Sequence, residues 1–296
     1  MPQRKLFRLK LRSRTLVLGE RTLIMGVLNV TPDSFSDGGK FFSLKRAIGG
    51  ALAMELAGAD LLDIGAESTR PGSTGISAAE ELRRLLPVLE ALRTRLKIPI
   101  SVDTQKAGVA EIALGAGAAI LNDISGLKND PRVAEVAARF GVPVILMHMR
   151  GTPRTMQKQP FAKNVLKDVI AGLRHAIAIA RRAGVRKSQI ILDPGIGFGK
   201  SFQQNYELLA RLPELAKLGY PLSVGTSRKG FLGATLASHG KPAPPEARIW
   251  GTAATVTASI LGGAHIVRVH DVAEMAQVAK VADALLQATR RESMQP

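Results

Sequence analysis

The sequence predicts an α/β fold, a (β/α)8 barrel of the TIM type with a short β-hairpin extension at its N-terminus. Short apolar segments rich in β-branched residues recur eight times along the 296 residues. Each is followed by a polar or glycine-rich turn and then by a segment with helical periodicity. No linker interrupts these units, which favours a closed parallel barrel over the alternative, an open doubly wound sheet.

The predicted strands are short and apolar, and most of them end at a polar residue. They span Leu23–Val30, Asp60–Ile64, Pro99–Asp103, Ala119–Asn122, Val142–Met147, Gln189–Asp193, Pro221–Val224 and His265–Val269. Eight strands are the number that closes a parallel barrel around an interior filled by side chains.

Segments of helical length fill the intervals between the strands. Apolar residues recur there at spacings of three and four, as at Leu82, Leu85, Leu86 and Leu89. Small residues mark the predicted boundaries, with Ser43 and Ser77 as N-caps and Gly58, Gly141 and Gly184 as stops.

The chain divides into a basic extension at residues 1–22, a barrel at residues 23–290 and a short tail at residues 291–296. In the extension, Leu16–Leu18 and Leu23–Met25 flank the turn Gly19–Arg21. This pattern predicts a hairpin over the bottom of the barrel. Three prolines within His239–Pro245 indicate an insertion in the seventh strand–helix unit.

The composition, 46% hydrophobic and 22% charged, is that of an ordinary globular protein. The absence of cysteine excludes disulfides, thiolate metal sites and cysteine nucleophiles, and it agrees with a cytoplasmic location. The first residues lack the apolar core of a secretory signal. The longest uncharged stretch, Ile249–Ala264, is too short to span a bilayer and predicts a buried helix. We therefore expect a soluble cytoplasmic protein without a membrane partner.

The formal net charge of +17 has two interpretations. Basic surfaces supply most of the non-specific affinity for nucleic acids, and they also attract the anionic substrates of enzymes. The basic residues are spread along most of the chain, and an aromatic content of 4% leaves few stacking platforms for single strands. The pattern favours an enzyme and argues against a nucleic-acid partner.

Polar residues stand where nearly every predicted strand ends, which is where (β/α)8 barrels carry their chemistry. A single Asp after a strand is usually only a helix cap, but caps do not require Asn, Lys, Arg and His at the same end. The residues at these ends include Asn29, Asp63, Asp103, Asn122, His148, Asp193, Ser227, Lys229, Arg268 and His270. Their number predicts one shared site for a small anionic substrate.

The run Asp193–Ser201 resembles two nucleotide-binding motifs but matches neither. A Walker A loop requires glycine where Pro194 stands, and a dinucleotide fingerprint requires glycine where Lys200 stands. We expect its glycines to let the backbone approach a flat ligand closely, with Phe198 beside that ligand. The alternative for Phe198 is plain packing.

The residue types at these ends divide by chemistry. Asp103, Asn122 and Asp193 offer carboxylates and an amide that can accept the paired N–H groups of a planar amino-heterocycle. Lys229, Arg268 and His270 are suited to an anionic end of the same ligand. Asn29, with Asp33 nearby, could offer oxygens to Mg²⁺, which binds through few protein ligands and substrate phosphates.

Seven segments of the chain, in order, resemble the dihydropteroate synthase family. The resemblance spans about residues 23 to 275. The segments are Met25–Gly39 (MGVLNVTPDSFSDGG), Asp63–Gly72 (DIGAESTRPG), Ser101–Thr104, Asn122–Gly126, Asp193–Lys200 (DPGIGFGK), Ser227–Gly230 and Arg268–Val272. Ala66 stands where the family commonly has a second glycine.

This resemblance implies a transferase of folate biosynthesis. It would join 6-hydroxymethyl-7,8-dihydropterin diphosphate to 4-aminobenzoate and release diphosphate, with Mg²⁺ as cofactor and a homodimer as the assembly. By resemblance, the pterin would contact Asp103, Asn122, Asp193 and Lys229, and the diphosphate Thr69, Arg268 and His270. Asn29 would contact Mg²⁺. The aminobenzoate would lie near Ser68, Thr69, Arg70, Pro71, Phe198 and Ser227.

Among these residues, we expect Asp103, Asp193 and Lys229 to be catalytic. The loops after the first and second strands would close over the site. The alternative is a methyltransferase on the same pterin-binding barrel, which would need no diphosphate site.

Overall fold

A computed structural model describes residues 4–31, 40–70, 72–157 and 161–292. Eight parallel strands form one sheet in the order β8-β7-β6-β5-β4-β3-β10-β9. The strands are β3 (Leu23–Asn29), β4 (Leu61–Gly65), β5 (Ile100–Asp103), β6 (Ile120–Asp123), β7 (Val144–Met147), β8 (Ile190–Asp193), β9 (Ser223–Val224) and β10 (Ile266–Val269). All eight predicted strands are confirmed, within one or two residues at each end.

The two edges of this sheet, β8 and β9, meet and close the barrel. A parallel bridge joins Leu192 to Leu222, and the Leu192 N–H donates to the carbonyl oxygen of Pro221 at 2.9 Å. The predicted (β/α)8 barrel is therefore confirmed, and the open-sheet alternative is wrong.

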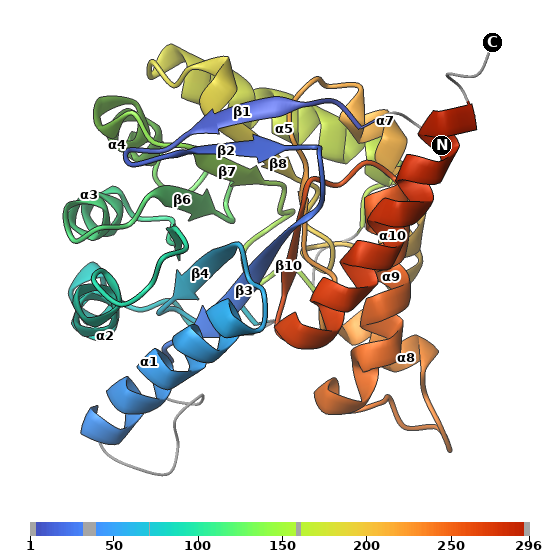
Figure 1. Cartoon of the computed structure of the whole chain (residues 1–296), viewed down its shortest axis with the longest axis horizontal. Coiled ribbons are helices and arrows are strands. Elements are labelled where there is room, and N and C mark those ends of the chain that lie inside the picture. The colour runs from blue at the N-terminus through green and yellow to red at the C-terminus, as the bar shows by residue number, and fades with distance from the viewer. Residues whose placement is uncertain (1–3, 32–39, 71, 158–160, 293–296) are drawn as a thin grey trace.

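Helices surround the strands, as Figure 1 shows. They are α1 (Lys40–Leu56), α2 (Ala78–Leu92), α3 (Ala107–Gly115), α4 (Arg132–Phe140), α5 (Val165–Arg182), α6 (Phe202–Ala210), α7 (Leu212–Ala216), α8 (Gly230–Thr235), α9 (Ile249–Leu261) and α10 (Val272–Glu292). Short 3-10 helices at Lys187–Gln189 and Pro245–Arg248 precede β8 and α9. None of the helices in the described part of the chain is long and apolar enough to cross a membrane.

The helix boundaries follow the predicted caps, with two differences. Ser77 caps α2 by accepting the Glu80 N–H, and Gly141 ends α4 in the left-handed conformation at φ 67°. Ser43 lies inside α1 and is not its N-cap. The uncharged stretch forms α9, but only one face of this helix is buried. Trp250, for example, is 79% exposed.

The N-terminal hairpin covers the bottom of the barrel, but its strands are not the predicted pair. It consists of β1 (Phe7–Lys10) and β2 (Thr15–Leu18), paired antiparallel. The segment Leu23–Met25 cannot pair with β2, because β3 already uses both of its edges for the parallel strands β10 and β4. The strand β2 therefore pairs with β1 instead.

Inward-facing residues form two layers inside the barrel. The lower layer, at the N-terminal ends of the strands, packs against the hairpin. The barrel residues of this layer are Leu23, Met25, Leu61, Ile120, Ile145, Ile191 and Ile266, and they form one cluster with Leu9, Leu11 and Leu18 of the hairpin segment. Because side chains on a strand alternate between faces, the residue two positions later also points inward, and there the polar layer begins.

Candidate active site

Asp63 on β4 lies at the centre of the polar layer and is fully buried. Its Oδ2 accepts a hydrogen bond from Asn122 Nδ2 on β6 at 2.9 Å and from Arg268 Nε on β10 at 2.7 Å. Arg268 also reaches Asp103 on β5, with Nη2 at 3.3 Å from Oδ2. Three predicted site residues are thus brought together through Asp63, which joins four strands of the barrel.

The sequence predicts Asp63 at a strand end of the shared site but gives it no binding or catalytic role. Its position two residues after the inward-facing Leu61 could have identified it, since both side chains must point into the barrel. Arg268, predicted to lie at the anionic end of the ligand, pairs its guanidinium with Asp63 and Asp103.

Two carboxylates, Asp63 and Asp103, lie near each other in the polar layer, and their proximity changes the acidity of one of them. Burial and the nearby Asp63 carboxylate raise the pKa of Asp103 to about 8, and the Arg268 guanidinium only partly offsets the increase. A ligand that presents N–H donors to Asp103 would favour its ionised form.

Asp193, Lys229 and Phe198 form the opposite side of the site. The Asp193 Oδ1 accepts the backbone N–H of Gly195 at 2.7 Å, and burial raises the pKa of this carboxyl to about 6. Burial and the neighbouring Arg268 lower the pKa of the Lys229 ammonium to about 8. The Lys229 Nζ lies 3.9 Å from the centroid of the Phe198 ring, a cation–π contact.

His270 and Ser227 interact directly. The Ser227 Oγ accepts the His270 backbone N–H at 3.2 Å and lies 3.1 Å from the ring Nδ1. Burial and the cations Arg268, Arg228 and Lys229 lower the pKa of His270 to about 4, so the ring is neutral at pH 7. It can offer a hydrogen bond to an anion but no positive charge.

Asp123 has a structural role, although it ends the same strand as Asn122. Its carboxylate accepts hydrogen bonds from Ser125 N, Ser125 Oγ and Leu127 N, at 2.7, 2.7 and 3.0 Å. These bonds hold the turn after β6, in which Leu127 has a positive φ of 64°. The Asp123 side chain therefore stabilises this turn, and we do not assign it to ligand binding.

Thr69 and Arg70 lie on the loop after β4, apart from the polar layer. Thr69 is half-buried and Arg70 is exposed. The loop is anchored by Glu67, which accepts the Ile76 N–H and the Lys106 ammonium, each at 2.8 Å. Among the residues described, no side-chain hydrogen bond or ion pair links Thr69 or Arg70 to Asp63, Asp103 or Arg268.

The loop after β3 falls mostly outside the described residues, and so do Asp33 and Pro71. Asn29, the predicted magnesium ligand, is the last residue of β3 and is half-buried opposite Gly65. In the part of the chain that is described, no three His, Asp or Glu side chains gather to hold a metal ion.

Comparisons with known proteins identify the family. The profile of the family described as pterin binding enzyme matches residues 25–270. A dihydropteroate synthase of Synechocystis is 53% identical over 90% of this chain and 91% of its own length. The chain belongs to the dihydropteroate synthase family. It is therefore a transferase of folate biosynthesis, as its motifs indicate.

Solved structures of dihydropteroate synthases have the same fold. The Xanthomonas albilineans enzyme with 4-aminobenzoic acid is 40% identical, with a TM-score of 0.86 over 99% of this chain and 100% of that chain. The Yersinia pestis enzyme in complex with a sulfonamide drug is 44% identical, with a TM-score of 0.86 over 97% of this chain and 100% of that chain. These likenesses to dihydropteroate synthases favour that activity over the methyltransferase alternative.

Proposed function

We propose that this dihydropteroate synthase condenses 6-hydroxymethyl-7,8-dihydropterin diphosphate with 4-aminobenzoate, giving 7,8-dihydropteroate and diphosphate. The observation that carries the proposal is the buried group Asp63, Asp103, Asn122 and Arg268, to which four strands contribute. A rigid set of carboxylate and amide groups suits the amino-heterocyclic edge of a dihydropterin. The N–H groups of the ring would replace the hydrogen bonds that these groups make with water before binding.

In this proposal Asp103, Asn122 and Asp193 bind the pterin ring, with Lys229 beside it. Asp63 orients this set, because its Oδ2 is shared by Asn122 and Arg268. Phe198 lies against Lys229 and would form one wall of the 4-aminobenzoate site. Thr69, Arg70 and Ser227 would complete that site once the loop after β4 closes.

The diphosphate would lie towards His270, Thr69 and the free side of Arg268. His270 is neutral there and acts as a hydrogen-bond donor, while Arg268 supplies the positive charge.

The residues at this end also fit a magnesium ion. Asn29 offers a single amide oxygen at the end of β3, which suits an ion that is held mainly by phosphate oxygens and water. When bound, Mg²⁺ would neutralise charge on the diphosphate.

The reaction would proceed by loss of the leaving group before attack of the amine. The bond between the methylene carbon and the diphosphate oxygen breaks, and its electron pair leaves with the diphosphate. The electron-rich ring stabilises the resulting cation, with the carboxylates of Asp103 and Asp193 favouring its positive charge. The neutral amine of 4-aminobenzoate then forms the C–N bond and releases a proton to solvent. Closure of the loops would exclude water, which competes for the cation.

A steady-state assay tests this function directly. The purified protein should release diphosphate from the pterin substrate only when both 4-aminobenzoate and Mg²⁺ are present, and 7,8-dihydropteroate should form in equal amount. Methyl transfer from a methylated folate to a corrinoid, without diphosphate release, would favour the methyltransferase instead.

We also propose that the enzyme is a cytoplasmic homodimer. The adjacent helices α9 and α10 carry the exposed apolar side chains Trp250 and Val281, which are 79% and 65% exposed. Exposed apolar groups on neighbouring helices are typical of an interface. Sedimentation should give twice the mass of the chain, and Trp250→Glu should shift the protein towards the monomer.

A further inference from the structure

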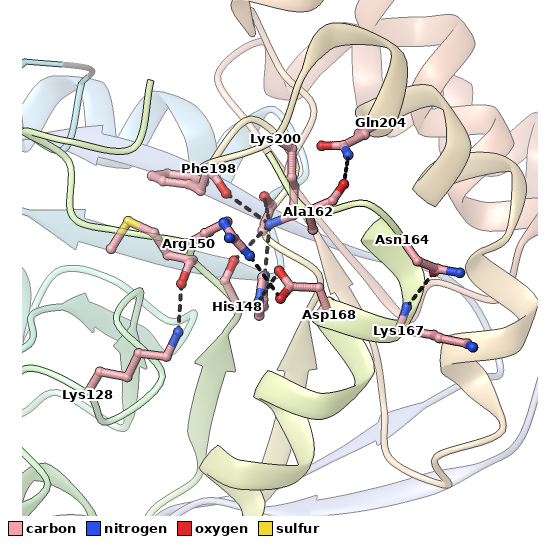
Figure 2. Close-up of polar contacts among 12 residues, drawn as sticks. Lys128, His148, Arg150, Ala162, Asn164, Lys167, Asp168, Phe198, Lys200 and Gln204 are labelled. Carbon is pink, nitrogen blue, oxygen red and sulfur yellow. Dashed lines mark hydrogen bonds and ion pairs between the residues drawn. The ribbon is translucent and has the colours of Figure 1, made fainter. Parts of the chain in front are cut away.

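Lys200 is a buried lysine that the proposed mechanism does not use. Its side chain belongs to a residue that is only 6% exposed, at the end of the loop between β8 and α6. Figure 2 shows its ammonium where this loop meets the loop after β7. The Nζ lies 2.8 Å from the carbonyl oxygen of Gly195, 3.0 Å from that of Phe198 and 3.1 Å from that of His148. A fourth contact, at 3.0 Å, is with His148 Nδ1.

These contacts join two loops whose backbones lie against each other. A Cβ added at Gly195 would collide with the carbonyl oxygen of His148, and one added at Gly199 would collide with that of Arg150. Both glycines also have positive φ, at 66° and 67°. The loop thus turns its carbonyl oxygens inward, and the Lys200 ammonium occupies the point where they converge. Burial lowers the pKa of Lys200 to about 7, while the converging carbonyl oxygens favour its charged form.

His148 is held as an acceptor for Lys200. Its Nε2 lies 3.5 Å from Asp168 Oδ2, and Asp168 also accepts Arg150 Nη1 at 3.2 Å (Figure 2). Burial and the neighbouring cations lower the pKa of His148 to about 2, so the ring is neutral. With the proton on Nε2, facing Asp168, the Nδ1 lone pair faces the Lys200 ammonium.

The loop that Lys200 holds carries groups of the site. Gly195, whose carbonyl oxygen binds Lys200, also donates its N–H to Asp193. Phe198, whose carbonyl oxygen binds Lys200, presents its ring to Lys229. The Asp193 backbone is fixed independently by the pairing of β7 with β8. Phe198 lies on the loop itself: its ring packs against the cluster of Ile124, Met147, Met149 and Met156, and its backbone is held by the turn to Gly195 and by Lys200.

We propose that Lys200 is a positioning residue for the synthase reaction, acting through the loop Gly195–Gly199 to place the Phe198 ring in the 4-aminobenzoate site. This inference rests on the proposed function. Lys200 thus has a positioning role beyond being part of the glycine-rich segment. Neutralising Lys200 should weaken use of 4-aminobenzoate much more than use of the pterin substrate.

The main test compares Lys200→Met with Lys167→Met, a control at an exposed lysine on α5. In Lys200→Met, the KM for 4-aminobenzoate should rise about tenfold or more while the KM for the pterin diphosphate changes less than about threefold. The control should leave both KM values unchanged. Equal changes in both KM values, or none, would overturn the proposal.

A double-mutant cycle tests whether Lys200 acts through Phe198. If it does, adding Phe198→Ala to Lys200→Met should reduce kcat/KM for 4-aminobenzoate little further than the larger single effect. Fully multiplicative effects would contradict that route. Lys200→Gln, which keeps two N–H donors without the charge, should give an intermediate KM and serves if the methionine variant fails to fold.

Hydrogen exchange separates this proposal from the proposed function, because it needs no turnover. Amides of the segment 195–199 should exchange about tenfold faster in Lys200→Met than in the wild type, and Lys167→Met should not change them. Faster exchange in Lys200→Met, together with no synthase activity in the wild-type protein, would support the loop contact and refute the proposed reaction. Unchanged exchange in Lys200→Met would refute the role of Lys200.

Discussion

At its N-terminal end the barrel is filled by leucine, isoleucine and methionine, whereas two residues further along the same strands it is lined by carboxylates, an amide and a guanidinium. The pairs are Leu61 and Asp63, Ile120 and Asn122, Ile191 and Asp193, and Ile266 and Arg268. Two residues of a strand span only about 7 Å. Packing and chemistry are thus separate layers of one barrel, which lets each be changed with little effect on the other.

The largest effect on activity is expected from Asp103→Asn in the polar layer. The amide keeps the size of the side chain but cannot carry the negative charge that the proposed cation requires, so kcat/KM should fall about a hundredfold or more. The free energy of unfolding should change little, because burial already raises the pKa of this carboxyl to about 8. Steady-state kinetics and urea unfolding measure the two quantities.

Asp123→Asn is the matched control, since Asp123 is a buried aspartate on the neighbouring strand whose oxygens bind backbone and Ser125 groups. It should lose stability, by about 1–3 kcal/mol, and keep kcat/KM within about threefold. The reverse outcome for these two variants would show that the two aspartates had been assigned to the wrong roles.

The next effect is expected from Leu61→Ala in the apolar layer. Leu61 is fully buried among the strands and the hairpin, so its truncation should leave a cavity and lower the free energy of unfolding by about 3 kcal/mol. The kcat/KM of the folded protein at 25 °C should remain within about twofold. A large loss of activity without loss of stability would mean that the two layers are coupled.

A smaller effect is expected in the number of protons that the polar layer releases when the pterin binds. With a pKa of about 8, Asp103 is mostly protonated at pH 7 in the free enzyme. The N–H groups of a bound pterin favour the carboxylate, so binding should release close to one proton, or roughly 0.9. Calorimetry of 6-hydroxymethyl-7,8-dihydropterin binding, in two buffers of different ionisation enthalpy, measures this release. The release should disappear in Asp103→Asn, and its persistence there would assign the proton to another group.

The sequence was sufficient to predict the barrel because the eight strands are buried on both faces. Continuous apolar runs such as Ile190–Leu192 stand out from the helices that flank them. Pairing in the hairpin could not be predicted in the same way. It depends on which strand edges remain free after the barrel closes, and that is a property of the whole fold.

The site was predicted in part for a related reason. Residues at strand ends could be found by their position alone, but contacts between them could not. Asp63 was passed over as a binding residue because only its partners Asn122 and Arg268 reveal its central place. Lys200 was noted only where a nucleotide-binding motif would need glycine. Its proposed role depends on the positions of backbone carbonyl oxygens, which cannot be deduced from a pattern of side chains.

The smallest effect is expected at the border between the two layers. Ser101 faces inward on β5, two residues before Asp103, and its buried Oγ has no hydrogen-bond partner among the described residues. An unsatisfied buried hydroxyl destabilises the folded state, so Ser101→Ala should raise the free energy of unfolding by about 1 kcal/mol. For a chain of this length that corresponds to a rise of about 2 °C in Tm. Kinetic constants should not change, because on this assignment the polar layer begins at Asp103. A loss of activity with unchanged Tm would place Ser101 in the polar layer, and the border would then lie at the same level on β4 and β5, where Asp63 pairs with Ser101.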